Sequence, residues 1–471
     1  KRNDHKAVNN HFELVRDFMN MKLKSTLITG AAILALLPSQ AFAAQISSEE
    51  AAALLERLNQ LEQEVVSLRT QLGNVETVQQ QQGEQVAKVE QVAQAQEKTS
   101  IKFKGAPEIK TDDGWSFKPR GRILYDFNNL SSVPSAVNIA GEGFSNEARR
   151  VRLGVQGTIP GGFGYKLEAD LLDGVELTDA YLDYESGGLT ITVGQHNNFQ
   201  SLEEISSSND TSFIERSAFT DAFGFQRKVG VSAAYKTGDV LLQGGVFTDN
   251  IDDLNDGNDS ISLDGRVVFA PKLGDAQLHL GGSIHWTDLG DTINSVRYRQ
   301  RPLIHSVDTR FINTGNIAAA EELSYGLEGA VISGRFHAAA ESHWAKVSRP
   351  GLMNPTFFGA SVEAGMFLTD DTREYKGGVF KGVKVNNPVG SGGSGAWQVN
   401  VRYDRLDLTD AGIIGGTQDG YMASLIWTPV DYVRFLVNYG HLSYGNALGI
   451  VAGAPNDYSV DVIGARAQIA F

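Results

Sequence analysis

Apolar and polar residues alternate with a period of two from Trp115 to the end of the chain. Trp115 and Phe117 are flanked by polar positions, and the last residues repeat the pattern through Ile469 and Phe471. Such alternation places apolar side chains on one face of a β-strand and polar side chains on the other. It predicts sixteen strands, starting near residues 115, 148, 163, 176, 187, 227, 239, 260, 275, 323, 335, 356, 394, 417, 431 and 457.

The connections between these strands alternate in length. Tight turns such as Pro160-Gly161-Gly162 alternate with long connections such as 197–226 and 288–322. This order is typical of an up-and-down meander with its long loops at one end. The segment 370–393 is long where a tight turn is due, so we expect it either to fold into the lumen or to reveal an error in the strand count.

Aromatic residues indicate which environment surrounds these strands. They lie towards the ends of the apolar faces, as in the girdles of transmembrane barrels, at Trp115, Trp286, Trp397, Trp427, Tyr125, Tyr403, Tyr421 and Tyr439. The terminal Phe471 on an alternating strand is similar to the assembly signal of outer-membrane barrels. The pattern therefore favours an all-β, 16-stranded antiparallel transmembrane β-barrel over residues 101–471, in a Gram-negative outer membrane, rather than a soluble β-sandwich.

Residues 44–100 have a different period. Apolar residues follow heptad spacing, at Leu54, Leu58, Leu61, Val65, Leu68, Leu72 and Val75. We predict a periplasmic coiled coil that joins several copies of the chain, with a trimer as one such assembly. The alternative is a single amphipathic helix lying on a globular partner.

The residues ahead of this helix have the pattern of a secretory signal peptide. Lys22 and Lys24 precede an apolar stretch at 27–37 and the cleavage signal Ala41-Phe42-Ala43, so 21–43 is the predicted signal peptide. Eleven apolar residues are too few for a membrane-spanning helix, which needs about 20. We expect residues 1–20 to be an upstream segment from a misassigned start.

Composition excludes several classes of protein. The 471 residues contain no Cys, which excludes disulfide scaffolds and thiolate chemistry. A formal charge of −15 argues against nucleic acid as the main partner. Neither a hydrolase elbow nor a zinc or phosphate-loop motif occurs in the sequence, and the nine His are scattered. We predict no enzyme activity, no cofactor and no metal.

Arginine is the notable residue on the polar faces. Guanidinium groups stay charged and match the oxygens of phosphate, and a series of them in a pore would offer an anion successive sites. The candidates in the strands and long loops are Arg122, Arg149, Arg150, Arg152, Arg216, Arg299 and Arg301. Inward carboxylates at Glu168, Asp170, Asp183 and Asp264 fit a general porin equally well, so these residues alone leave both interpretations open.

Several short motifs occur in an order that resembles the phosphate-selective porin O/P family. They are Phe117-Lys118 with Gly121-Arg122 and Asp126, Ala148-Arg149-Arg150 with Leu153, Leu202-Glu203 with Glu215-Arg216, Val268-Phe269-Ala270-Pro271, Arg299-Gln300-Arg301-Pro302 and Tyr325-Gly326-Leu327-Glu328-Gly329-Ala330. The resemblance implies a homotrimer of 16-stranded barrels with inward-folded loops and passive uptake of phosphate or polyphosphate. It maps an arginine ladder onto Arg122, Arg149, Arg150, Arg216, Arg299 and Arg301.

This chain departs from the family pattern in two places. It has Arg152 where the family has a Tyr, and its candidate lysine wall is sparse, with Lys104, Lys110 and Lys118. We therefore predict an outer-membrane porin for small anions, phosphate or polyphosphate. The alternatives are a general or differently selective porin, or a structural barrel tethered to peptidoglycan through the coiled coil.

Overall fold

The computed structural model describes residues 48–97, 99–134, 142–172, 174–255, 257–447 and 455–471. The predicted signal peptide and the upstream segment 1–20 lie outside the described residues. The chain divides into two units between Val92 and Ala93.

The described part of the first unit is one long helix, α2 (Ser48–Glu97), whose last residues belong to the second unit. The predicted helical structure is present, and the heptad residues are exposed, with Leu54 59% and Leu61 54% exposed. Their association into a coiled coil stays a prediction. Among the described residues, no helix has both the length and the apolar character that a membrane span requires.

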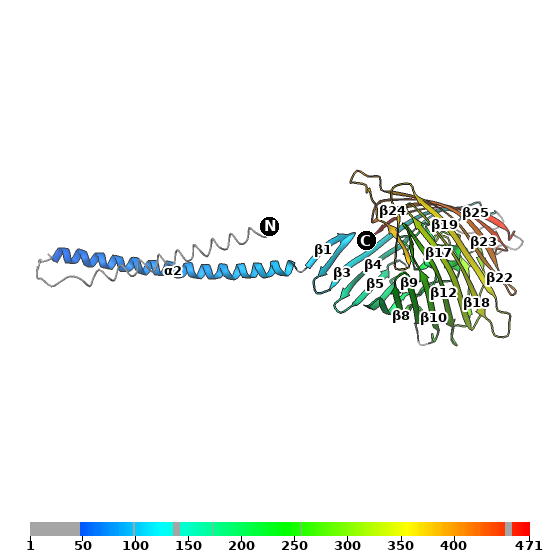
Figure 1. Cartoon of the computed structure of the whole chain (residues 1–471), viewed down its shortest axis with the longest axis horizontal. Coiled ribbons are helices and arrows are strands. Elements are labelled where there is room, and N and C mark those ends of the chain that lie inside the picture. The colour runs from blue at the N-terminus through cyan, green and yellow to red at the C-terminus, as the bar shows by residue number, and fades with distance from the viewer. Residues whose placement is uncertain (1–47, 98, 135–141, 173, 256, 448–454) are drawn as a thin grey trace. The chain divides into compact units, whose positions relative to one another are not determined.

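The second unit contains a closed antiparallel barrel of sixteen strands, coloured from cyan at β3 to red at β25 in Figure 1. Asp461 of β25 pairs with Ser131 of β3, and the pairing continues to Ala470 opposite Arg122, which closes the ring. The strands are β3 (Ser116–Ser131), β4 (Gly143–Ile159), β5 (Phe163–Asp170), β6 (Glu176–Ser186), β7 (Leu189–Asn197), β8 (Arg227–Thr237), β9 (Val240–Phe247), β10 (Ile261–Phe269), β12 (Ala276–Asp288), β17 (Glu321–Ser333), β18 (Phe336–Ser348), β19 (Thr356–Phe367), β22 (Ala396–Asp410), β23 (Ile413–Val430), β24 (Val433–Gly445) and β25 (Tyr458–Ala470). The predicted fold class is confirmed.

Shorter elements accompany the barrel. A hairpin of β1 (Thr99–Lys104) and β2 (Ala106–Thr111) precedes it and joins β3 through the pairs Ile109–Phe117 and Lys110–Ser116. The connections carry α3 (Leu202–Ile205), α4 (Ala218–Ala222), β11 (Lys272–Leu273), β13 (Ser295–Val296), β14 (Arg299–Gln300), β15 (Ile312–Asn313), β16 (Ile317–Ala318), β20 (Arg373–Lys376) and β21 (Val379–Val383).

The alternation along the strands sorts side chains between the outside and the lumen. On β3, Ile123 and Phe127 are 49% and 45% exposed on the outer face, whereas Arg122 and Asp126 are buried in the lumen. Trp397 and Trp427 stack side by side on neighbouring strands, with ring centroids 5.5 Å apart. An apolar outer band with aromatic residues is the surface that lipid requires of a barrel.

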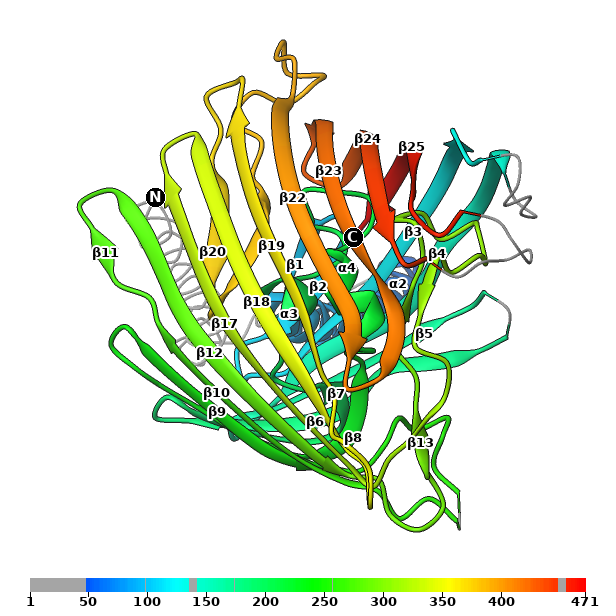
Figure 2. The ribbon, with the colours of Figure 1, turned by 90° about the vertical axis from the view of Figure 1, so that its right-hand side faces the viewer.

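Two connections fold into the lumen. Figure 2 shows α3 and α4, from the connection between β7 and β8, inside the ring of strands. From the short-turn end, the β20–β21 hairpin brings Val379 and Phe380 against Leu202 and Ile332. The long segment at 370–393 is therefore a hairpin folded inward, and the strand count stands.

Candidate functional site

The lumen contains a cavity of about 770 Å³ between strands β3–β8 and the inward segment 198–226. Ten Lys and Arg line it against six Asp and Glu, although the whole chain has a net charge of −15. The cations are Arg120, Arg122, Arg149, Arg150, Arg152, Lys166, Arg216, Arg227, Arg301 and Lys381, and the carboxylates are Glu176, Asp179, Asp183, Glu204, Glu215 and Asp221. The cavity is therefore locally basic.

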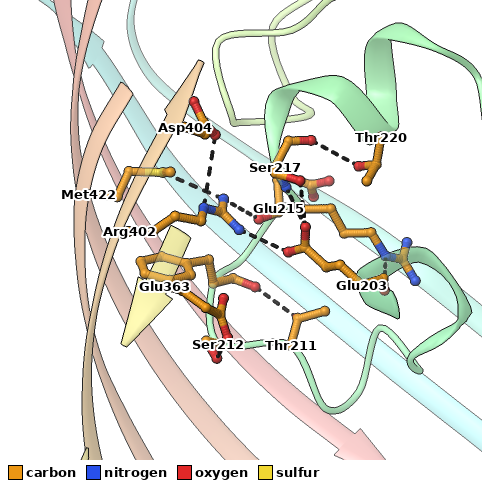
Figure 3. A network of polar contacts seen from close by, with 12 residues as sticks. Glu203, Thr211, Ser212, Glu215, Ser217, Thr220, Glu363, Arg402, Asp404 and Met422 are labelled. Carbon is orange, nitrogen blue, oxygen red and sulfur yellow. Dashed lines mark hydrogen bonds and ion pairs between the residues drawn. The ribbon is translucent and has the colours of Figure 1, made fainter. Parts of the chain in front are cut away.

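The inward segment is held against the other side of the barrel, from β18 to β25. Figure 3 shows Arg402 of β22 aimed at this segment, where its Nη1 donates to Glu203 Oε1 at 2.9 Å and its Nη2 to the Glu215 carbonyl at 2.9 Å. Three strands further, on β25, Arg466 Nη1 donates to the Ile214 carbonyl at 2.7 Å. Charged wall residues thus bind the segment and leave the lumen open beside β3–β8.

Both ends of α3 are fixed by charged side chains. The Glu341 carboxylate on β18 accepts hydrogen bonds of 2.8 Å from Ser201 Oγ and from the backbone N–H groups of Leu202 and Glu203. A carboxylate suits this position because the first N–H groups of a helix lack partners within it. At the other end, Arg216 donates to the carbonyls of residues 203, 204 and 206. Arg216 therefore lines the cavity and also terminates the helix.

Five of the seven predicted arginines form ion pairs with carboxylates, and one of them, Arg216, lies 3.3 Å from Glu204. Arg122 lies 3.0 Å from Glu168, and both side chains are buried. Arg152 lies 2.8 Å from Asp170. The inward carboxylates that sequence parity indicated thus neutralise part of the arginine wall.

Arg149 is paired with a residue of the inward segment. Its Nε lies 2.8 Å from Glu215 Oε1. Burial raises the pKa of the Glu215 carboxyl, but the nearby guanidinium groups of Arg149, Arg466 and Arg150 together outweigh that effect and hold the pKa below its usual range. Glu215 therefore stays ionised and offsets the charge of Arg149.

The Arg150 side chain makes no hydrogen bond or ion pair with any residue that the structure describes. A register shift explains its position: Leu124 pairs with Arg150 and Tyr125 with Ala148, which leaves Arg149 as an extra residue on β4. A β-bulge of this kind lets two consecutive side chains reach the same side of a sheet. Arg149 and Arg150 accordingly both line the cavity.

The two arginines of the loop between β12 and β17 are separated. Arg301 lines the cavity, its backbone N–H donates to Asp221 at 2.9 Å, and its guanidinium lies 3.4 Å from Asp308. Arg299 is exposed on β14 and is not among the residues lining the cavity. The structure therefore brings together six of the seven predicted arginines.

A second cavity of about 290 Å³ opens towards the short-turn end of the barrel. It shares Arg120, Arg122, Ser207 and Lys381 with the first cavity. Arg120 donates to Gln156 Oε1 at 2.6 Å, and Lys381 makes no hydrogen bond or ion pair within the described part of the chain. These four residues, which we call the junction, connect the two cavities.

Sequence analysis missed four of the lining cations as site residues. Arg120 and Lys166 have the inward parity of their strands, which was the available signal. Arg227 is the first residue of β8 and shares Asp179 with Lys166, at 2.9 and 2.6 Å. The position of Lys381 could not be predicted from strand parity, because it depends on the inward fold of the β20–β21 hairpin. Across the described residues, no group of three or more His, Asp and Glu is placed to hold a metal ion.

Comparisons with known proteins agree with this architecture. The family model for phosphate-selective porin O and P matches residues 117–471. An uncharacterised protein of Caulobacter vibrioides is 47% identical over 384 residues, covering 79% of this chain and 77% of that protein. Porin O of Pseudomonas aeruginosa is 28% identical over 353 residues, covering 67% of this chain and 78% of that protein.

A solved structure shows the same fold at low sequence identity. It is the loop L8 deletion mutant of OmpT, an outer membrane protein of Vibrio cholerae, with a TM-score of 0.50 and 13% identity over 76% of this chain and 100% of that chain. The closed barrel, its apolar outer band and the match over 117–471 lead to one assignment. The chain is an outer-membrane porin and belongs to the phosphate-selective porin O and P family.

Proposed function

We propose that this porin passively conducts small anions, with phosphate or polyphosphate as the preferred substrates. The observation that carries the proposal is the excess of lining cations over carboxylates in the main cavity of an otherwise acidic chain. Low-dielectric walls concentrate the field of such charges and raise the local concentration of the opposite ion. Neither a cofactor nor catalytic chemistry is part of the proposal.

The proposed anion path begins at the long loops. It passes the seven predicted arginines, with Arg299 at the outer loop surface and Arg122, Arg149, Arg150, Arg152, Arg216 and Arg301 in the cavity. The paired arginines keep the wall rigid, because their carboxylate partners hold each guanidinium in place. Between them an anion meets Arg150, whose side chain has no hydrogen-bond or ion-pair partner among the described residues.

The path continues through the junction to the second cavity. Arg120 is bonded to an amide rather than a carboxylate, and Lys381 makes no ion pair with the described residues, so both retain their charge for a passing anion. Lys104 and Lys118 lie in and beside the β1–β2 hairpin at the same end, with Lys118 Nζ donating to the Lys104 carbonyl at 3.1 Å. Several moderate sites in series would allow entry without trapping the ion.

The ion pairs of these arginines favour one alternative function, a general or differently selective porin. Since Glu168, Asp170 and Glu215 neutralise three of them, a general or differently selective porin would also have this wall. The two functions differ in what phosphate does to the current: a binding site produces block at low concentration, whereas a general pore does not.

We further propose that the porin is a homotrimer whose helix α2 forms a coiled coil in the periplasm. The support is the exposed heptad seam of α2. A rival role for the helix is contact with peptidoglycan, which would make the barrel an envelope tether. In a tether, removal of α2 would weaken the envelope and leave trimers intact.

The test is planar-bilayer conductance of the purified full chain in a chloride gradient, followed by titration with phosphate. Anion-selective reversal potentials with phosphate-dependent block support the proposal. Weak or cation-leaning selectivity without block would identify a general porin.

A further inference from the structure

The β1–β2 hairpin presents an unusually apolar face outside the barrel. Phe103 is 78% exposed and Ile101 is 60% exposed, and Ile109 lies opposite Ile101 in the pairing register. The opposite face is polar, with Lys102 paired across the hairpin to Glu108. Exposed apolar clusters with a polar reverse side mark surfaces that contact another molecule.

This apolar face is continuous with the outer face of the barrel. Ile109 pairs with Phe117, which is 44% exposed on the outer side of β3. The hairpin is also fixed in place: a Cβ added at Gly105, in its turn, would lie 2.7 Å from the Tyr432 ring and 2.8 Å from Phe471. It is therefore a rigid extension of the barrel wall at the short-turn end, beside the C-terminus.

The position of the hairpin in the chain suggests what covers this face. One residue separates Glu97, the end of α2, from Thr99, the start of β1. Helices in a coiled coil pack roughly 8–10 Å apart. Phe103 follows Glu97 by six residues, so the chain can carry it at most about 20 Å from the helix end.

The barrel is wider than the distance of about 20 Å that the chain can span between the end of α2 and Phe103. Strands about 4.8 Å apart in a tilted ring of sixteen give a diameter of roughly 30 Å. If the helices of several copies associate, the hairpins of these copies are brought close to one another, since each lies within this reach of its helix end. The outer face of the hairpin, with Ile101 and Phe103, is then available to a neighbouring copy.

We propose that the outer face of the β1–β2 hairpin, comprising Ile101, Phe103 and Ile109, is a contact surface for a second copy of this chain. This inference rests on the proposed association through α2. The inference goes beyond that association, because it assigns a subunit contact to the hairpin, which lies outside both the helix and the barrel strands. The tethered helices raise the effective concentration of the hairpins for one another.

The natural chain has no Cys, so single Cys substitutions give clean crosslinking probes. The probe is Phe103→Cys in the full chain within outer membranes, treated with a short bis-maleimide and run on a denaturing gel. Lys102→Cys is the matched control, because it is the neighbouring exposed residue on the opposite face. Leu68→Cys probes the helix seam separately, and Ile101→Cys repeats the hairpin test should Phe103→Cys fail to fold.

We expect crosslinked dimers for Phe103→Cys and Leu68→Cys, with Lys102→Cys remaining monomeric. If Leu68→Cys forms crosslinked dimers but neither Phe103→Cys nor Ile101→Cys does, the hairpin contact is rejected and the coiled coil is supported. Crosslinking of Phe103→Cys without Leu68→Cys would keep the hairpin contact and reject the helix assembly. Equal crosslinking of Lys102→Cys and Phe103→Cys would also overturn the inference, since the contact would then not be specific to the apolar face.

Discussion

At the scale of single residues, the pore combines paired and unpaired cations. Arg122 and Arg152 are held by carboxylates, whereas Arg150 and Lys381 have no hydrogen-bonded or ion-pair partner among the described residues. A charged group that already has a carboxylate partner attracts a passing anion less than a free one. The unpaired cations are therefore the residues whose removal should change selectivity most.

We predict that Arg150→Ala weakens phosphate block. Loss of a hydrogen bond to a charged group costs about 1.5–3 kcal/mol, so the phosphate concentration for half-block should rise about 10- to 100-fold. The measurement is phosphate titration in planar bilayers. Arg405→Ala is the control, because Arg405 pairs with Asp419 at 2.9 Å and does not line either cavity. Equal effects of the two substitutions would contradict a specific role for Arg150.

We also predict that Lys381→Ala reduces anion selectivity at the junction, since it removes a cation that both cavities share. Lys376→Ala is a matched control on the same hairpin, where Lys376 is exposed and lines neither cavity. Reversal potentials in a chloride gradient should shift towards zero for Lys381→Ala and stay unchanged for Lys376→Ala. A normal reversal potential in Lys381→Ala would remove the junction from the anion path.

At the scale of elements, the width of the pore depends on how the inward segment 198–226 lies on the wall. Phe219 of α4 packs over Gly359 of β19, where an added Cβ would lie 2.3 Å from the Phe219 Cβ. Asp404 accepts the backbone N–H of Ala218 at 3.2 Å beside it. The fit of α4 to β19 and β22 thus requires a residue without a side chain at 359.

We predict that Gly359→Ala displaces α4 towards the cavity. Overpacking of this kind typically costs about 1–3 kcal/mol, which a barrel of this size should tolerate. Single-channel conductance should fall or become noisy, while trimers still form. Gly329→Ala is the control, because the nearest atom to its added Cβ is 3.9 Å away. Unchanged conductance in Gly359→Ala would show that α4 does not limit the pore.

At the scale of the whole molecule, the proposed anion path and the proposed coiled coil belong to different units. The two cavities of the lumen are lined by residues of the barrel unit, and the heptad seam belongs to α2. Each buried Leu in a coiled coil contributes about 1.5–3 kcal/mol. The helix is therefore expected to stabilise the assembly without setting the current through one barrel.

We predict that deletion of residues 48–97 lowers the temperature at which trimers dissociate and leaves conductance per barrel unchanged. Heating in mild detergent before electrophoresis measures the first quantity, and bilayer recording the second. Trimers of full thermal stability after the deletion would point to the tether role of α2. Loss of the channel itself would show that the two units do not function separately.

The barrel, its strand number and the sorting of side chains could all be predicted from the amino-acid sequence. Period-two alternation is a local property, so inward and outward faces such as Arg122 and Ile123 follow from parity alone. Even the inward fold of 370–393 was one of two expected outcomes. Strand ends were less predictable: β4 begins at Gly143 rather than near 148, since residues 143–147 continue the pairing with β3.

Which of the described cations lack a carboxylate partner depends on the tertiary structure. Arg149 and Arg150 are neighbours of the same type, yet Glu215 of a distant segment pairs with one and not the other. Lys381 reaches the junction because Arg266 on β10 donates to the Gly378 carbonyl at 3.0 Å and so helps hold its hairpin in the lumen. Such contacts join residues more than 60 positions apart, and the spacing of residues along one strand carries no information about them.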